Sequence, residues 1–583
     1  VIQMSVLASW RGVALLAVAT VLASSAAAAA APDDALAAAE SEPRFPVVNT
    51  ELGPVRGIRL NNVTAFWGVP FAEPPVGKLR FKPPQPHKGW THIWDALPPG
   101  RAFCSQLRLS DKVFIGGEDC LYMDIFMPAG AEEGPADREV LVYIPGGAFI
   151  IGNADQEGLY DGHALAQEKG VVVVAMQYRL GVLGFLAHDE LRKENEHGST
   201  GTYGIQDQRR AMRWVQENVK HFGGDPDKVT LFGQSAGGMS VCAHFASPAS
   251  AGLFRAAIVE SGNCDSPFVF PSLQTALGTG RAYALQLGCS GSDVPACLRA
   301  KSTGEIMANG LFPGTPLAPL LPWGPAVDGS EDGLEMVPLE AVKQGRFNDV
   351  PLVMGFNKDD GSMFLYIMPL IDGHALLPLT ESRLNDLMMH LFGNSTFAGD
   401  ILEAYELGSA GLPNYDAIGK AIIRDYIFAC SERRMARALE VQGHSDVWMY
   451  NFSYTLPDWI EARVLGTYHT AELPFVFQHP WIHLHFSERD RGVAEAVGAY
   501  WSAFWSSGDP GKAPNLFPHW PRYTAAAAEA GAAVMDIDGP EPRLMGDPDS
   551  LCALWDAAPP TSLEALLSQQ RHENAPYNRR MFQ

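Results

Sequence analysis

Short apolar runs alternate with helical patterns through the first half of the chain. Residues 140–144 (VLVYI) and 171–176 (VVVVAM) are continuously apolar, which is typical of strands covered on both faces of a parallel sheet. Between residues 207 and 222, apolar side chains recur at a helical spacing that ends before Gly-Gly-Asp-Pro. The run at 229–232 (VTLF) then predicts another strand. This order of strand, helix and strand predicts an α/β protein with a mostly parallel central sheet.

The second half of the chain is less regular. From about residue 265 to 470, Pro-rich stretches such as 311–325 (LFPGTPLAPLLPWGP) interrupt helical segments, a pattern that indicates large insertions into the sheet. The Ala-rich residues 525–533 predict a surface loop or a short helix. Residues 557–583 are predicted to form a polar C-terminal tail.

The N-terminal residues 1–31 have the pattern of a signal peptide. Arg11 is the only charged residue before Asp33, and an apolar stretch followed by small residues comes after it. The alternative is a signal anchor, because residues 12–31 are long enough to cross a bilayer. That stretch is largely Ala and Ser, so we expect cleavage, export to an extracellular or periplasmic location, and no stable membrane span. The exported domain is predicted over residues 45–556.

Composition narrows the classes of function. Of the 583 residues, 47% are hydrophobic, which is enough for a large core and excludes overall disorder. The 66 acidic residues exceed the 43 basic ones and give a formal net charge of −23. Phosphate binding needs a basic face, so a nucleic-acid partner is not expected.

Candidate chemistry begins where the 229–232 strand ends. The sequence there reads Gly233-Gln-Ser-Ala-Gly237 and leads into a helical segment. A serine on such a sharp turn between strand and helix has a strained backbone and an exposed hydroxyl, and its neighbours two positions away must be small. Ser235 is therefore the candidate nucleophile; the alternative is an ordinary serine at the start of a helix.

A serine nucleophile requires a base and a carboxylate that orients it. Two downstream loops carry such groups: residues 355–362 (GFNKDDGS), with Asp359 and Asp360 as alternative acids, and residues 466–472 (GTYHTAE), with His469. The turn at 144–149 (IPGGAF) and the amide of Ala236 could supply the backbone donors for an oxyanion.

Several segments together resemble the type-B carboxylesterases, the cholinesterase-like branch of the α/β-hydrolase fold. The resemblance covers about residues 45–556. It is carried by residues 65–75 (AFWGVPFAEPP), 118–122 (EDCLY), 222–237, 357–361 (NKDDG) and 469–477. It implies an α/β-hydrolase fold with helices on both faces of the sheet and large insertions, and hydrolysis of small-molecule carboxylic esters through an acyl-enzyme intermediate without a cofactor.

The resemblance also assigns roles to individual residues. It implies a nucleophile, an acid and a base at Ser235, Asp360 and His469, and oxyanion donors at Gly147, Ala148 and Ala236. A lipase or sterol esterase on the same fold is an alternative, which would need an exposed apolar lid. A non-catalytic adhesion protein similar to the neuroligins is a second alternative, but those proteins lack the nucleophile that is present here.

The eight cysteines suit an oxidising compartment. From the residues alone, local pairs such as Cys104/Cys120 and Cys289/Cys297 are plausible but other pairings stay open. The family resemblance implies these two disulfides and a third between Cys430 and Cys552. It leaves Cys242 and Cys264 as expected free thiols.

Pro145 stands where many members of the family have His or Tyr, with no obvious penalty, and two further departures from the family pattern bear on substrate preference. Gln234 precedes the candidate nucleophile where the family usually has Glu, which removes one negative charge beside the base. The segment between Cys104 and Cys120 contains no tryptophan, whereas cholinesterases place a choline-binding tryptophan there. A preference for choline esters is therefore not expected.

The remaining candidate groups favour structural roles. His479, His483 and His485 could suggest a metal, and a strand would place His483 and His485 on one face. No third ligand for that pair is identifiable, so we predict packing or surface histidines and no metal site. Glu472 is predicted to be the buried partner of a structural ion pair. Ser261 is predicted to pack behind the active site.

Overall fold

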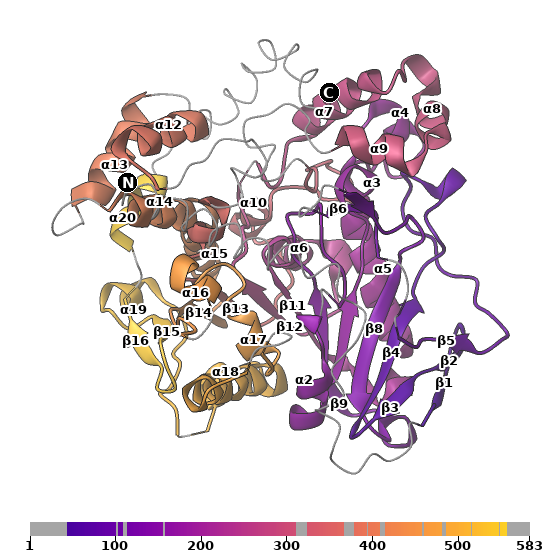
Figure 1. Cartoon of the computed structure of the whole chain (residues 1–583), viewed down its shortest axis with the longest axis horizontal. Helices are drawn as coiled ribbons and strands as arrows, with labels where there is room; N and C mark the ends of the chain where they lie inside the picture. The colour runs from indigo at the N-terminus through magenta and orange to yellow at the C-terminus, as the bar shows by residue number, and fades with distance from the viewer. Residues whose placement is uncertain are drawn as a thin grey trace, which may run out of the picture.

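The computed structural model describes residues 44–556, except 99, 101–102, 109–112, 156–157, 267, 311–322, 366–377, 393–394, 408–413, 458–459, 481–484, 515 and 547–548. Within them, an 11-stranded sheet forms the centre of the molecule (Figure 1). Its strands run from β10 to β15 in parallel, and antiparallel strands flank them at both edges.

The strands of this sheet are, in spatial order, β16 (Arg543–Met545), β15 (Val534–Ile537), β14 (Val447–Phe452), β13 (Leu352–Asn357), β12 (Ala256–Glu260), β11 (Gly224–Gln234), β9 (Arg138–Ile144), β10 (Val172–Met176), β8 (Tyr122–Pro128), β4 (Val63–Pro70) and β3 (Ile58–Leu60). Two small sheets contain β1 (Val47–Thr50), β2 (Gly53–Arg56) and β5 (Trp94–Asp95), and β6 (Gln106–Arg108) and β7 (Val113–Ile115).

The helices that pack on the sheet or extend from it are α2 (His163–Lys169), α3 (Gly181–Phe185), α4 (Asp189–Lys193), α5 (Tyr203–Asn218), α6 (Ala236–Phe245), α7 (Leu273–Gln286), α8 (Val294–Ala300), α9 (Thr303–Gly310), α10 (Pro338–Lys343), α12 (Glu381–Phe392), α13 (Ser395–Leu407), α14 (Tyr415–Arg424), α15 (Cys430–Val441), α16 (Ile460–Leu465), α17 (Leu473–Val476), α18 (Glu488–Ser507), α19 (Ala525–Glu529) and α20 (Asp549–Asp556).

Both faces of the sheet are buried, and a separate apolar core covers each. Along β9, Val140, Val142 and Ile144 point into one core, while Leu141 and Tyr143 point into the other. Helices α5, α6 and α15 contribute to the first core, and α2, α17 and α18 to the second. This two-sided burial explains why the central strands are apolar at every position instead of alternating.

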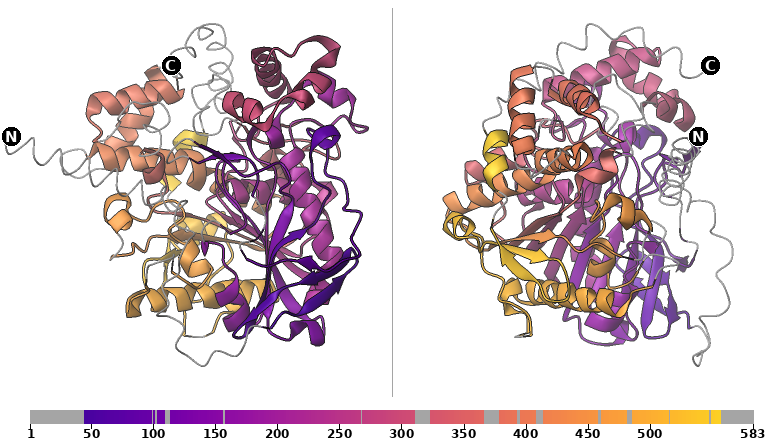
Figure 2. Two further views of the ribbon diagram at one scale, coloured as in Figure 1. Left: turned by 45° about the vertical axis from the view of Figure 1, so that its right-hand side comes forward. Right: turned by 60° about the vertical axis from the view of Figure 1, so that its left-hand side comes forward.

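The insertions follow the carboxyl ends of two neighbouring strands. Helices α7 to α9 come after β12 and helices α12 to α14 after β13. Both groups lie on the upper side of the molecule in Figure 1, and Figure 2 shows them on the same side from two further directions. Because the carboxyl ends of parallel strands meet at one edge of a sheet, these insertions surround the region in which the predicted chemistry lies.

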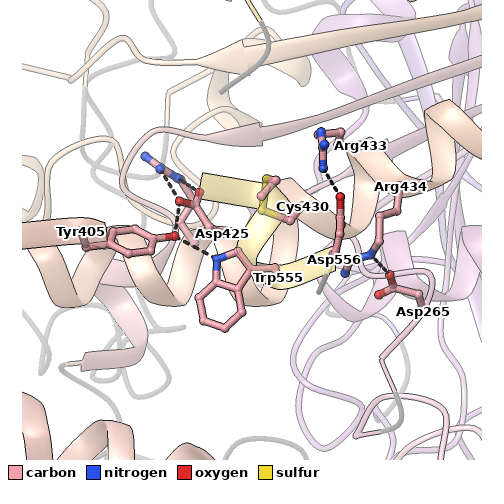
Figure 3. Close-up of a disulfide and its surroundings, with 10 residues drawn as sticks. Asp265, Tyr405, Asp425, Cys430, Arg433, Arg434, Trp555 and Asp556 are labelled. Atoms are coloured by element: carbon pink, nitrogen blue, oxygen red, sulfur yellow. Dashed lines mark hydrogen bonds and ion pairs between the residues drawn. A yellow bond between two sulfur atoms is a disulfide. The ribbon is translucent and has the colours of Figure 1, made fainter. Parts of the chain in front are cut away.

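The last described helix, α20, is tied to α15. The disulfide Cys430–Cys552 joins the two helices, and Arg433 donates to Asp556 at 2.8 Å (Figure 3). On the other side, the Trp555 indole donates to the Tyr405 hydroxyl of α13 at 3.0 Å. A covalent bond and two polar contacts therefore fix the end of the described chain.

The predicted elements agree with this architecture. The apolar runs are strands β9, β10 and β11, the helical pattern at 207–222 is α5 followed by a 3-10 turn, and residues 525–529 form the short helix α19. Helix α5 begins at Tyr203, before the predicted start. The apolar pattern missed its first turn because the buried face there includes the polar residues Gln206, Asp207 and Gln208. The predicted signal peptide and C-terminal tail lie outside the described residues.

Candidate active site

Ser235 lies at the junction of β11 and α6 with a strained backbone. Its φ of 59° and ψ of −125° lie outside the regions that side chains ordinarily favour. The Ser235 amide donates to the Glu260 carbonyl of β12 at 2.9 Å, and its own carbonyl accepts from Met239 of α6 at 2.8 Å. Both the sheet and the helix therefore hold the turn, and the hydroxyl projects from the first residue before a helix N-terminus.

Two glycines allow this turn to form. A β-carbon on Gly237 would lie 1.9 Å from the Ile144 carbonyl oxygen, and one on Gly233 would lie 2.6 Å from the Gly237 carbonyl carbon. The helix thus packs directly on the backbone of β9 and β11, and the small neighbours expected around the nucleophile are a requirement of this contact.

The structure brings Asp360 and His469 together in the interior. Nδ1 of His469 lies 2.8 Å from Oδ1 of Asp360, and both residues are buried. Asp360 also accepts from the Ser261 hydroxyl at 2.9 Å and from the Asn357 amide at 2.7 Å. Ser261, predicted to pack behind the site, is therefore a hydrogen-bond donor to the predicted acid.

Asp359, the alternative acid, has a different position. It is half-buried, and its carboxylate accepts from the Thr467 amide at 2.9 Å, which ties the 355–362 loop to the 466–472 loop. The geometry therefore places Asp360, and not Asp359, against the imidazole.

The His469 ring is enclosed by side chains from three elements. Phe428 stacks on it with a centroid distance of 4.8 Å, and Phe364 lies 5.2 Å away. The Gln234 amide nitrogen is 3.3 Å from Nδ1 and 3.2 Å from Nε2. An atom equally distant from both ring nitrogens lies over the face of the ring, because an in-plane position would collide with the carbon between them. Gln234, adjacent to Ser235, thus links the serine turn to the predicted base.

The predicted oxyanion turn lies against the serine. A β-carbon on Gly146 would be 3.0 Å from Cβ of Ser235. Gly147 has a φ of 112°, and a β-carbon there would be 2.2 Å from the Ile151 carbonyl oxygen, so this position requires glycine. Ala148 has a φ of 54°. The turn that contains Gly147 and Ala148 thus contacts Ser235 through Gly146, and Ala236 is the first residue of α6 after the serine.

Glu472 does not form the predicted ion pair. It is buried and accepts a hydrogen bond from the Asn357 side-chain amide. No ion pair of Glu472 occurs within the described part of the chain. Burial first, then the nearby Glu260 and Asp360 carboxyls, raise the pKa of Glu472 well above its usual range. A neutral carboxyl needs no basic partner, and here it accepts its hydrogen bond from the Asn357 amide.

Two further buried glutamates adjoin the site and were not identified from the sequence. Burial raises the pKa of Glu260 to about 8, opposed by a hydrogen bond from the Trp501 indole at 3.1 Å. Burial also raises the pKa of Glu432 well above its usual range. The burial of Glu260 could have been predicted from the sequence, because this residue ends an apolar strand. Glu432 lies in a charged helical segment that gives no such signal.

The expectation of two free thiols is wrong. The structure contains the disulfides Cys104–Cys120, Cys289–Cys297 and Cys430–Cys552 that the family resemblance implies, together with a fourth between Cys242 and Cys264. Cys242 lies on α6 and Cys264 follows β12, on which α6 packs, so their Cα atoms are 5.4 Å apart. Sequence separation alone does not reveal that contact.

Of the candidate metal histidines, His479 and His485 lie within the described residues. Among the described residues, no group of three or more His, Cys, Asp or Glu side chains is arranged to hold a metal ion. His479 bonds through Nδ1 with the neighbouring Pro480 carbonyl at 2.9 Å, and His483 lies outside the described residues.

Across the described residues, every helix is too short or too polar to cross a bilayer.

A strained serine between a strand and a helix, at the carboxyl edge of a mostly parallel sheet, is typical of the α/β-hydrolase class. Comparison with known proteins agrees. Residues 44–541 match the model of the carboxylesterase family, and the chain belongs to that family. It is a carboxylic ester hydrolase.

Curated relatives cover most of the chain. A cocaine esterase of Homo sapiens is 33% identical over 82% of this chain and 86% of its own length. An acylcarnitine hydrolase of Mus musculus is 32% identical over 82% and 85%. An acetylcholinesterase of Bungarus fasciatus is 30% identical over 89% and 87%. The predicted family resemblance is therefore confirmed.

A solved structure confirms the predicted fold. The crystal structure of a carboxylesterase from Geobacillus stearothermophilus superposes with a TM-score of 0.74 at 30% identity. It covers 87% of this chain and 99% of that protein.

Proposed function

We propose that this protein is a secreted serine esterase in which Ser235 attacks the ester, His469 transfers the proton and Asp360 orients the imidazole. The observation that carries the proposal is the buried contact of 2.8 Å between His469 and Asp360. Gln234, the residue before Ser235, contacts the His469 ring and so connects this pair to the serine turn.

The hydrogen bond to Asp360 determines which nitrogen of the base is used. Because Nδ1 faces the carboxylate, Nε2 is the nitrogen left to accept the Ser235 hydroxyl proton. The serine oxygen then bonds to the acyl carbon, and the alcohol leaves with the proton that His469 returns. Water repeats the sequence, with His469 as its base, to release the acid and restore Ser235.

The charge that develops on the carbonyl oxygen needs fixed donors. We assign the amides of Gly147, Ala148 and Ala236 to this role, since the first two lie in the turn against Ser235 and the third begins α6. The helix N-terminus also favours negative charge there. Loss of one such donor typically costs about 100- to 1000-fold in kcat.

Secretion is supported by two independent features. Residues 1–31 have the signal-peptide pattern, and the four disulfides suit an oxidising compartment.

A pre-steady-state measurement tests the proposal. Mixing the enzyme with p-nitrophenyl esters of increasing chain length should give a burst of p-nitrophenol that matches the enzyme concentration, followed by slower turnover. Ser235→Ala should fold with an unchanged circular dichroism spectrum and lose about 10⁴-fold or more in kcat. A Ser235→Ala variant that keeps the burst would refute the assignment.

A further inference from the structure

Three glutamates outside the proposed Ser235–His469–Asp360 set lie in the interior beside it. Glu260 ends β12, Glu432 lies on α15 and Glu472 precedes α17. Their exposed fractions are 0%, 0% and 2%. Acidic side chains are almost never fully buried without a reason, so three in one region require an explanation.

Glu260 adjoins the serine. Its carbonyl oxygen accepts from the Ser235 amide at 2.9 Å, and its side-chain Oε1 accepts from the Trp501 indole at 3.1 Å. The side-chain contact therefore anchors the end of β12 to α18, and the main chain of that same residue holds the strained turn.

Glu432 adjoins the acid. Its Oε1 accepts from the Gly262 amide at 2.8 Å. The preceding residue, Ser261, donates its hydroxyl to Asp360 at 2.9 Å. Ser261 has a φ of 47°, which an L-residue adopts only under constraint, and the contact from Glu432 fixes the chain immediately after it.

Glu472 adjoins both the acid and the base. It accepts from the Asn357 side-chain amide, whose nitrogen also donates to the Tyr468 carbonyl at 2.9 Å, next to His469. The main-chain amide of Asn357 donates to Asp360 at 2.7 Å. One side chain thus connects the loops that carry the acid and the base.

The surroundings favour uncharged carboxyls. None of the three forms an ion pair with a basic side chain within the described residues, and the second oxygen of each carboxyl has no protein partner there. The titratable groups that interact with them are acidic or phenolic: Asp360, Tyr143, Tyr160, Tyr450 and one another. Burying several carboxylates together without cations is strongly unfavourable because each charge loses its hydration, and burial raises the pKa of all three.

We propose that Glu260, Glu432 and Glu472 serve as neutral positioning residues, each holding a segment that contacts Ser235, Asp360 or His469. With these three carboxyls neutral, none of them competes with Asp360 for the imidazole. The inference rests on the proposed function, but it makes a claim about protonation that can be measured without turnover.

Infrared difference spectroscopy in deuterated buffer tests that claim. At about pH 7, above the usual range of an exposed carboxyl, the wild type should show the carbonyl band of protonated carboxyls. Glu260→Gln, Glu432→Gln and Glu472→Gln should each remove part of it. Glu495→Gln, an exposed position on α18, should leave it unchanged. A wild-type spectrum without the band would overturn the proposal, and this measurement does not depend on whether any variant folds.

Kinetics test the positioning role. Glu472→Gln keeps an acceptor for Asn357 and exchanges one neutral group for another, so kcat/KM should stay within about threefold and the acid limb of its pH profile should not move. Glu472→Ala loses the acceptor, and kcat should fall about tenfold or more with little change in KM. An acid limb that shifts by about one pH unit in Glu472→Gln would mean that a carboxylate charge was removed.

The two proposals fail in different ways. If Ser235→Ala remained active, the proposed nucleophile would be wrong while the infrared band could still be present. If the band were absent and Ser235→Ala inactive, the serine mechanism would hold and the neutral-carboxyl proposal alone would be rejected.

Discussion

At the scale of single residues, close backbone contacts around Ser235 decide whether the site can form. The turn places α6 directly on β9 and β11, and at Gly233 and Gly237 an added β-carbon would collide with backbone atoms. The strain at Ser235 is maintained by hydrogen bonds to β12 and within α6, as expected where surrounding structure stabilises an unfavourable conformation.

Gly237→Ala should destabilise the fold and reduce esterase activity. Its β-carbon would lie 1.9 Å from the Ile144 carbonyl oxygen, a backbone atom that cannot move without shifting β9. We expect a loss of about 3 kcal/mol or more in the free energy of unfolding. Gly304→Ala is the control, since no atom lies within 4 Å of the added carbon. Urea unfolding measures both, and equal midpoints would contradict the packing argument.

Glu260→Gln should stabilise the protein at neutral and alkaline pH. The folded pKa of about 8 lies above the ordinary glutamate pKa of 4.5, so the folded state binds this proton more tightly than the unfolded state. Wild-type stability therefore falls as pH rises from about 4.5 to 8, by at most about 1.4 kcal/mol per pH unit. The variant lacks this group. The melting temperature of Glu260→Gln, compared with that of the wild type, should rise over that pH window and level off above it. A difference in melting temperature that does not change with pH would contradict the raised pKa of Glu260.

At the scale of elements, the disulfides connect segments that the sheet brings together. Cys430–Cys552 ties α20 to α15 across 122 positions, whereas Cys242–Cys264 ties α6 to the segment after β12 across 22. Arg433, Arg434 and Trp555 add polar contacts around the first (Figure 3).

Removing Cys430 and Cys552 together should cost more stability than removing Cys242 and Cys264. The difference in loop entropy is about 1.5 kcal/mol, and loss of the first pair also frees the end of the chain. Urea midpoints of the two double-alanine variants measure the difference. Peptide mapping without reduction should recover four bridged pairs, and alkylation of Cys242 or Cys264 in the folded protein would contradict the fourth.

Local pattern was enough to predict the core strands, and motif order was enough to select the site candidates. The apolar run at 229–232 and the glycines around Ser235 can be read as a local motif, although the contact that requires Gly237 is with Ile144 of β9. The Cys242–Cys264 bond and the neutral Glu472 depend instead on how α6 packs on β12 and how two distant loops meet. Such contacts depend on tertiary structure, and neither spacing nor residue type encodes them locally.

At the scale of the whole molecule, the net charge of −23 favours encounter with cationic substrates without binding them specifically. Recognition of a quaternary ammonium usually relies on an aromatic face, worth up to about 2 kcal/mol when desolvated. Between Cys104 and Cys120 the only aromatic side chain is Phe114, and Gln234 supplies no carboxylate.

The enzyme should therefore show little intrinsic preference for choline esters. Comparing kcat/KM for butyrylcholine with that for its uncharged 3,3-dimethylbutyl isostere separates long-range electrostatic attraction of the cation from its specific binding in the site. Any preference at low salt should disappear near 1 M salt, where the Debye length is about 3 Å. A preference of about tenfold that persists there, more than 1 kcal/mol, would indicate another aromatic site.

In the proposed mechanism one serine, Ser235, carries the acyl group. The most direct test is to treat the intact enzyme with a fluorophosphonate and locate the adduct by mass spectrometry of the digested protein. We expect one adduct per chain, on the peptide that contains Ser235, formed in step with the loss of esterase activity and absent from Ser235→Ala. An adduct on any other serine that accompanies inactivation would contradict it.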